Sequence, residues 1–70
     1  MQEVERLMKM ANQIADNLSF HDDAVERIAD HLHRFWAPSM LQKIVEHEAA
    51  GAGGLNPAAK AAVQRLAESG

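Results

Sequence analysis

Hydrophobic residues recur at every third or fourth position through most of this chain, which is the spacing of one face of an α-helix. In the first eighteen residues Val4, Leu7, Ala11, Ile14 and Leu18 form such a stripe, which Met8, Met10 and Ala15 widen. These positions also fit the a and d sites of two heptads, so the segment is expected to pack against another helix. No segment shows the strict alternation of a half-buried strand. The pattern predicts an all-α fold, a small bundle of three to four short helices in one domain over residues 1–70.

Breaks in the periodicity place the expected helices at about residues 2–18, 23–36, 38–50 and 57–68. Asp23 is followed three residues later by Glu26, which is the spacing of a capping box at a helix start. Pro38 disfavours helical angles at Ala37, so the second helix is expected to end near Trp36. Proline is also favoured in the first turn of a helix, so the third helix is expected to begin at Pro38.

Glycines separate the third expected helix from the last. The run Gly51-Ala52-Gly53-Gly54 is expected to end the third helix and to act as a flexible hinge. Asn56 followed by Pro57 is typical of a helix start, with asparagine as the cap and proline in the first turn. The last helix is rich in alanine, which buries little area per residue. We therefore expect it to be the most weakly docked helix. Only Leu55, Val63 and Leu66 give this part of the chain larger apolar side chains.

Length and composition limit what can stabilise this fold. A domain of 70 residues gains only about 3–5 kcal/mol net from its core. Small chains usually compensate with disulfides, metals or association. The chain has no cysteine, which excludes disulfides and thiolate metal sites. A partner subunit or self-association is therefore the expected additional source of stability.

The charge pattern excludes several classes of partner. The formal net charge is −3, and no segment gathers the lysines and arginines that displace counterions from nucleic acid. The first residues are acidic where a signal peptide is basic, and no apolar run approaches the ~18–20 residues that span a bilayer. We expect a cytoplasmic protein that binds neither nucleic acid nor a membrane.

Candidate chemistry is sparse. His31 and His33 lie two apart, which on a helix points them about 200° away from each other and prevents shared coordination of a metal. Ser39 has no residue that would orient a base beside it. The pair Asp22 and Asp23 is explained by helix capping. The sequence therefore predicts no metal ligand and no catalytic residue, and it predicts surface histidines with His31 partly buried.

The aromatic residues offer the clearest candidate for specific contact. The only tryptophan and one of the two phenylalanines are adjacent, at the expected end of the second helix. They could be core residues that close the second helix onto the third, or Trp36 at least could contact a partner. Interfaces are enriched in Trp, Arg and Met, so both interpretations stay open. The candidate partner-binding residues are Arg34, Phe35, Trp36, Pro38 and Met40.

Two motifs together resemble the delta subunit of soluble NAD-dependent formate dehydrogenase. One is the run Met10-Ala11-Asn12-Gln13-Ile14-Ala15, and the other joins Ile28–Leu32 to Arg34-Phe35-Trp36, Pro38 and Met40. The resemblance covers roughly residues 8–66, including the Gly-rich turn and the Ala-rich last helix. Ala37 stands where the family often has a polar residue, and Ser39 and Leu41 stand where it often has arginine.

The resemblance implies a non-catalytic accessory subunit that docks on the large alpha subunit of the formate dehydrogenase complex. It implies a role in assembly, maturation or stability. The molybdenum or tungsten cofactor, the iron–sulfur clusters and the FMN would belong to the partner subunits, and this chain would hold no cofactor.

Two other functions remain as alternatives. One is a self-associating helical module, with the stripe from Val4 to Leu18 forming a homodimer when the chain is isolated. The other is a DNA-binding helix–turn–helix protein. The third expected helix would be its recognition helix, and there Lys43 is outnumbered by Glu46 and Glu48. This charge balance disfavours binding to DNA.

Overall fold

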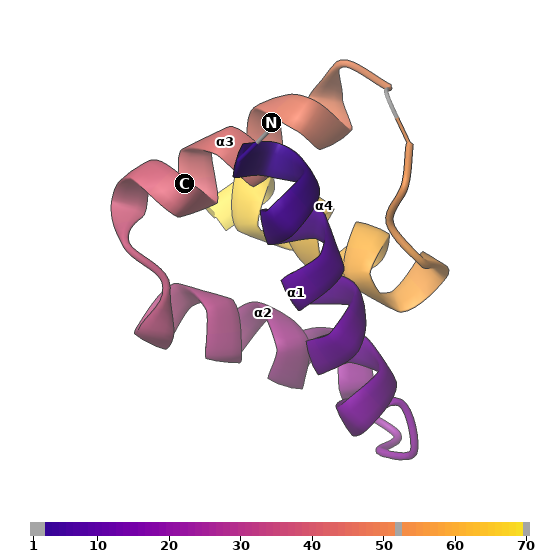
Figure 1. Cartoon of the computed structure of the whole chain (residues 1–70). Coiled ribbons are helices and arrows are strands. Elements are labelled where there is room, and N and C mark those ends of the chain that lie inside the picture. Colours follow the sequence, from indigo (N-terminus) through magenta and orange to yellow (C-terminus); the bar gives the residue numbers. More distant parts are fainter. Residues whose placement is uncertain (1–2, 52, 70) are drawn as a thin grey trace.

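The computed structural model describes residues 3–51 and 53–69, and that part of the chain contains helices and no strand. The helices are α1 (Glu3–Leu18), α2 (Ala24–Phe35), α3 (Pro38–Ala49) and α4 (Pro57–Ser69) (Figure 1). The expected all-α fold, a small helical bundle, is confirmed. Each helix end lies within one residue of the expected position, except that position 2, the expected start of the first helix, lies outside the described residues.

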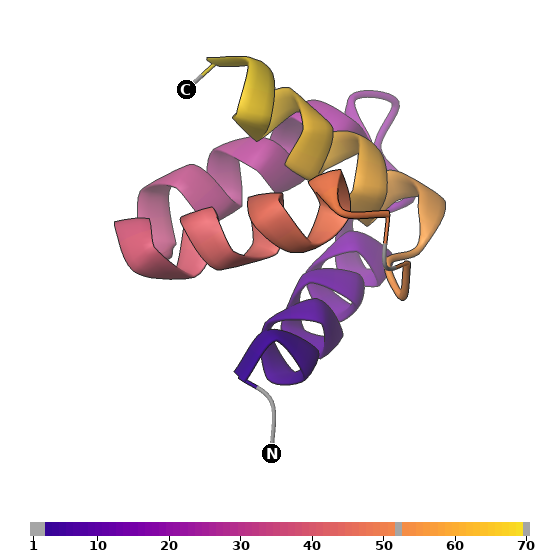
Figure 2. The same cartoon turned by 90° about the horizontal axis from the view of Figure 1, so that it is seen from above.

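The order of the helices in space differs from their order in the chain. α2 and α3 are joined by a short turn and diverge from it, and α4 lies between them and packs against both (Figure 1). α1 crosses the other three helices and contacts all of them, as the view from above shows (Figure 2). α4 is therefore the central element of the bundle, although it is the last helix in the chain.

The core is small and combines a few bulky side chains with many alanines. Four large side chains are fully buried, namely Ile28, Leu32, Ile44 and Val63. The remaining buried residues are Leu7, Ala11, Ala15, Ala29, Trp36, Ala59 and Ala62. The centre of the α1 stripe is thus buried inside the chain, where it is not available as a homodimer surface.

The expectation that the last helix would be weakly docked is wrong. Ala59, Ala62 and Val63 of α4 have no exposed surface, and α4 contacts α1, α2 and α3. The physical reason is that alanine lets two helix backbones approach closely. Close approach brings more neighbours around each methyl group, so the small area of each alanine does not mean loose packing.

The helix starts follow the sequence in two cases and depart from it in one. α3 begins at Pro38, and α4 begins at Pro57, where the Ala59 N–H donates to Asn56 Oδ1 at 2.8 Å. The capping box at Asp23 is wrong, because this side chain makes no cap hydrogen bond. Instead Asp23 Oδ1 accepts a hydrogen bond from Arg27 Nε at 2.7 Å.

Hydrogen bonds fasten the connection between α3 and α4 to the rest of the bundle. Asn12 of α1 donates through Nδ2 to the carbonyl of Gly54 at 2.9 Å, and its Oδ1 accepts from the Asn56 N–H at 2.8 Å. His47 Nε2 lies 2.8 Å from the carbonyl oxygen of Gly53. The φ angles of Gly51, Gly53 and Gly54 are 73°, 80° and 98°, a region that favours glycine. That this connection acts as a hinge stays a prediction.

We predict that Asn12→Ala lowers the free energy of unfolding by about 1–3 kcal/mol, because it leaves the partly buried Asn56 N–H without its acceptor. Gln13→Ala, at the exposed neighbouring position, should cost under about 0.5 kcal/mol. Urea unfolding followed by circular dichroism measures both. Equal stability of the two variants would show that Asn12 does not hold the α4 start.

The Asp23–Arg27 pair predicts a specific response to acid. The hydrogen bond from Arg27 holds the pKa of Asp23 below its ordinary value. Because this pKa is lower in the folded state, the ionised carboxylate stabilises the fold at pH values above the unfolded pKa of about 3.9. This contribution is lost as the pH falls through the folded-state pKa. The stability difference between the wild type and Asp23→Asn should therefore shrink as the pH is lowered from 6 to 3. Melting temperatures across that range test it, and a constant difference would contradict it.

Candidate partner-binding surface

The structure divides the aromatic pair at the end of α2 between the core and the surface. Trp36 is 6% exposed and belongs to the core, whereas Phe35 is 71% exposed. The Trp36 N–H still donates to the carbonyl of Leu32 at 2.9 Å, but its φ and ψ of −93° and 141° are extended. The chain leaves the helix at this residue. The core interpretation therefore holds for Trp36 and is wrong for Phe35, and contact of either residue with a partner stays a prediction.

The side chain of Phe35 is accompanied by polar groups of α2. The ring of His31, one turn earlier, lies 4.7 Å from the Phe35 ring between centroids, with a tilt of 41°. Arg34 donates from Nε to a carboxylate oxygen of Asp30 at 3.0 Å, and both side chains are mostly exposed. The end of α2 therefore presents an exposed phenylalanine and, at the preceding position, an exposed arginine, and both residue types are enriched at protein interfaces.

The five candidate residues do not form one exposed face. Arg34, Phe35 and Pro38 are exposed, Met40 is half-buried and Trp36 is buried. Trp36 can therefore position neighbouring residues from the core side, but it has little exposed surface with which to contact a partner. The role of the whole set in binding a partner stays a prediction.

A second exposed aromatic residue was not singled out by sequence reasoning. Phe20 lies in the turn between α1 and α2 and is 77% exposed. Its ring centroid is 4.2 Å from that of His21. The signal in the sequence was its position outside both helical stripes, within the break of the periodicity. Phe20 and Phe35 lie at opposite ends of α2.

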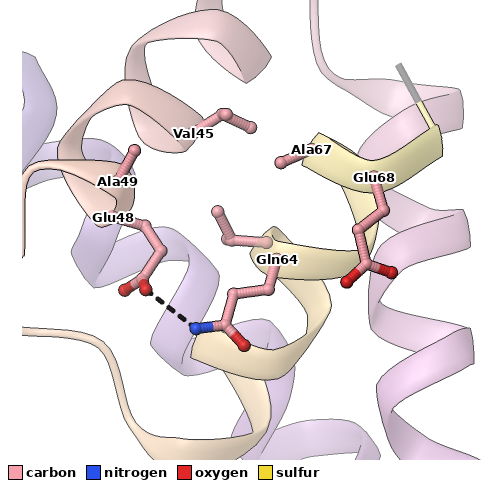
Figure 3. A pocket seen from close by; sticks show the side chains of 7 residues that line it. Val45, Glu48, Ala49, Gln64, Ala67 and Glu68 are labelled. Atoms are coloured by element: carbon pink, nitrogen blue, oxygen red, sulfur yellow. Dashed lines mark hydrogen bonds between the residues drawn. The ribbon is translucent and has the colours of Figure 1, made fainter.

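A groove between α3 and α4 is the other surface feature that the sequence did not reveal. It has a volume of about 370 Å³, and Figure 3 shows residues of both helices around it. Glu48 Oε2 accepts a hydrogen bond from Gln64 Nε2 at 3.0 Å across the helix pair. The residues that line the groove are Val45, Glu48, Ala49, Val63, Gln64, Ala67 and Glu68.

The described residues contain no cluster of three or more His, Cys, Asp or Glu side chains that could hold a metal ion. His31 is half-buried beside Phe35, as expected, and His33 is exposed. Within residues 3–51 and 53–69, no helix has the length and hydropathy needed to cross a bilayer.

Comparison with known families gave one match. The family model described as the NADH-dependent formate dehydrogenase delta subunit, FdsD, matches residues 6–63, which is most of the chain. The matched range contains α1 from residue 6 onward, all of α2 and α3 and the first half of α4, and with them every candidate partner-binding residue. No curated protein and no solved structure matched.

The unequal burial of Trp36 and Phe35 predicts unequal losses of stability when each side chain is truncated. Trp36→Ala should cost about 3–5 kcal/mol, as for other buried tryptophans, which is comparable with the whole net stability of a domain this small. Phe35→Ala should change stability by less than about 0.5 kcal/mol, because the ring is exposed. Thermal unfolding by circular dichroism distinguishes them, with Trp36→Phe as the conservative control. A folded Trp36→Ala variant with a wild-type melting temperature would contradict the assignment of Trp36 to the core.

Proposed function

Because the chain belongs to the family of NADH-dependent formate dehydrogenase delta subunits, we propose that it is a non-catalytic accessory subunit of a formate dehydrogenase complex. It docks on the large metal-containing alpha subunit and supports assembly, maturation or stability of the complex in the cytoplasm. The observation that carries this proposal is the family match over residues 6–63.

The proposal assigns the redox groups to the other subunits. Iron–sulfur clusters are held mainly by cysteine thiolates, and this chain has no cysteine. Its described residues also offer no cluster of metal-binding side chains. We propose that the iron–sulfur clusters and the molybdenum or tungsten cofactor are held by the partner chains. Formate oxidation and electron transfer through the clusters and FMN to NAD are assigned to the partner chains.

Phe35 is the proposed centre of the docking surface. Complete burial of a phenylalanine side chain contributes about 1.5–3 kcal/mol, and this ring is still 71% exposed in the isolated chain. Arg34 and Pro38, which are close to it in the chain, are also exposed, and Met40 is half-buried. Trp36 fixes the end of α2 from the core side. Exposed aromatic side chains of this kind are enriched at protein interfaces.

Self-association is the second candidate function, and the exposure of Phe35 is the observation that favours it. The same ring could pack against a second copy when the alpha subunit is absent. The stripe of α1 is a poor alternative surface, because Leu7, Ala11 and Ala15 are buried in the chain's own core. Light scattering of the isolated wild-type chain and of Phe35→Ala distinguishes a Phe35-dependent dimer from a monomer.

The proposed function predicts that Phe35→Ala weakens binding to the complex by about 2 kcal/mol, or roughly 30-fold, as truncation of a dominant interface residue does. Phe20→Ala is a matched control, because it removes an equally exposed ring at the other end of α2. A tagged chain is co-expressed with the other formate dehydrogenase subunits and purified by its tag. The amount of bound alpha subunit and the formate-dependent reduction of NAD are then measured.

The outcomes separate the parts of the proposal. Stoichiometric wild-type complex, lost with Phe35→Ala and kept with Phe20→Ala, supports docking through the surface around Phe35. Equal recovery of both variants contradicts that surface and leaves the accessory role. Free wild-type chain beside active enzyme contradicts a permanent subunit and favours a transient role in maturation.

A further inference from the structure

The groove between α3 and α4 lies on helices that do not carry Phe35. Its apolar side chains come from both helices. Val45 on α3 and Ala67 on α4 point toward one another across the gap, and Ala49 lies farther along α3 (Figure 3). Val63 has no exposed surface and closes the groove from the core side. Ala49 and Ala67 are too short to fill the space between the helices. Small residues on both helices therefore leave the groove open.

The polar groups of the groove are acidic. Glu48 lies on the α3 side and Glu68 on the α4 side, with the Gln64 amide between them (Figure 3). No lysine or arginine lines the groove. The Glu48–Gln64 hydrogen bond engages one carboxylate oxygen, and no hydrogen bond within the described residues involves the Glu68 carboxylate. An occupant without a positive charge would desolvate two carboxylates without compensation, which is unfavourable.

The size and shape of the groove indicate that its occupant is a row of side chains along a polypeptide segment. The volume of about 370 Å³ is in the range of cavities that receive ligands, roughly 300–1,000 Å³. Small-molecule sites bury most of the surface of their ligand, whereas this groove is open to solvent along the helix pair. A channel between two helices with an apolar floor instead suits an amphipathic helix laid along it.

We propose that this groove binds a short amphipathic helix of a formate dehydrogenase subunit, with an apolar row against Val45 and Ala67 and lysine or arginine opposite Glu48 and Glu68. The inference rests on the proposed function, because the occupant belongs to that complex. It adds a second docking surface, recognised by charge as well as by apolar contact.

The test uses the formate dehydrogenase complex purified without this chain as the binding partner. The principal variant is Glu48→Lys with Glu68→Lys, which reverses both groove charges without touching the buried core. The matched control is Glu5→Lys with Asp22→Lys, which makes the same change in net charge at exposed positions outside the groove. A third variant, Ala67→Leu, fills the groove without a change of charge. Circular dichroism establishes that each variant is folded before affinities are measured by biolayer interferometry.

The expected result is at least a roughly 10-fold loss of affinity for the groove reversal and less than about 3-fold for the control, since opposed like charges across an interface are strongly unfavourable. Ala67→Leu should also weaken binding. The affinity of the wild type should fall with added salt more steeply than that of the groove reversal.

Each contrary outcome has a separate meaning. If the wild-type chain does not bind the complex, its role as a permanent docked subunit is contradicted and this inference is overturned with it. If the wild type binds, Phe35→Ala weakens binding and the groove reversal behaves as the control does, the inference is overturned and the function stands. If the groove reversal instead abolishes a dimer of the isolated chain seen by light scattering, the occupant is a second copy and the inference is overturned.

Discussion

The close approach of α4 to its neighbours is the constraint on which the rest of the bundle depends. α2 and α3 diverge from their turn, and the space between them is filled by α4 (Figure 1). Only a helix with alanine at Ala59 and Ala62 can lie that close to both, because a larger side chain at either fully buried position would push the backbones apart. Without α4, Ile28 and Ile44 would lose a wall of the core, so the first three helices have no complete core of their own.

The position of α4 is in turn fixed by polar contacts with α1. Asn12 accepts from the Asn56 N–H, and Asn56 caps α4 by accepting from the Ala59 N–H. One hydrogen-bonded chain thus connects α1, the Gly-rich connection and the first turn of α4. The packing of apolar groups is not directional, whereas these hydrogen bonds are, so they select one placement of α4 among those that apolar contact alone would permit.

Local sequence rules predicted the helix starts that depend on neighbouring residues. The features that depend on long-range packing could not be predicted in this way. The starts at Pro38 and Pro57 followed from proline and asparagine chemistry within a few positions. The cap at Asp23 failed because Arg27, one turn away, offered its carboxylate a charged donor instead. The separation of Phe35 from Trp36 depends on where the chain leaves α2, which the sequence located only to within a residue. The α3–α4 groove joins residues from opposite sides of the Gly-rich connection, and no local pattern encodes such a juxtaposition.

The small core of the chain and its proposed docking surfaces are connected through stability. A folded chain of this size has about 3–5 kcal/mol of net stability, and a partner present at 100 times its dissociation constant adds about 2.7 kcal/mol. The α3–α4 groove exists only while α4 is in place, since one of its sides belongs to that helix. A partner bound there would therefore favour the folded bundle by a substantial fraction of its own stability. Folding of this chain and assembly of the complex would then be thermodynamically coupled, which is the behaviour expected of an accessory subunit.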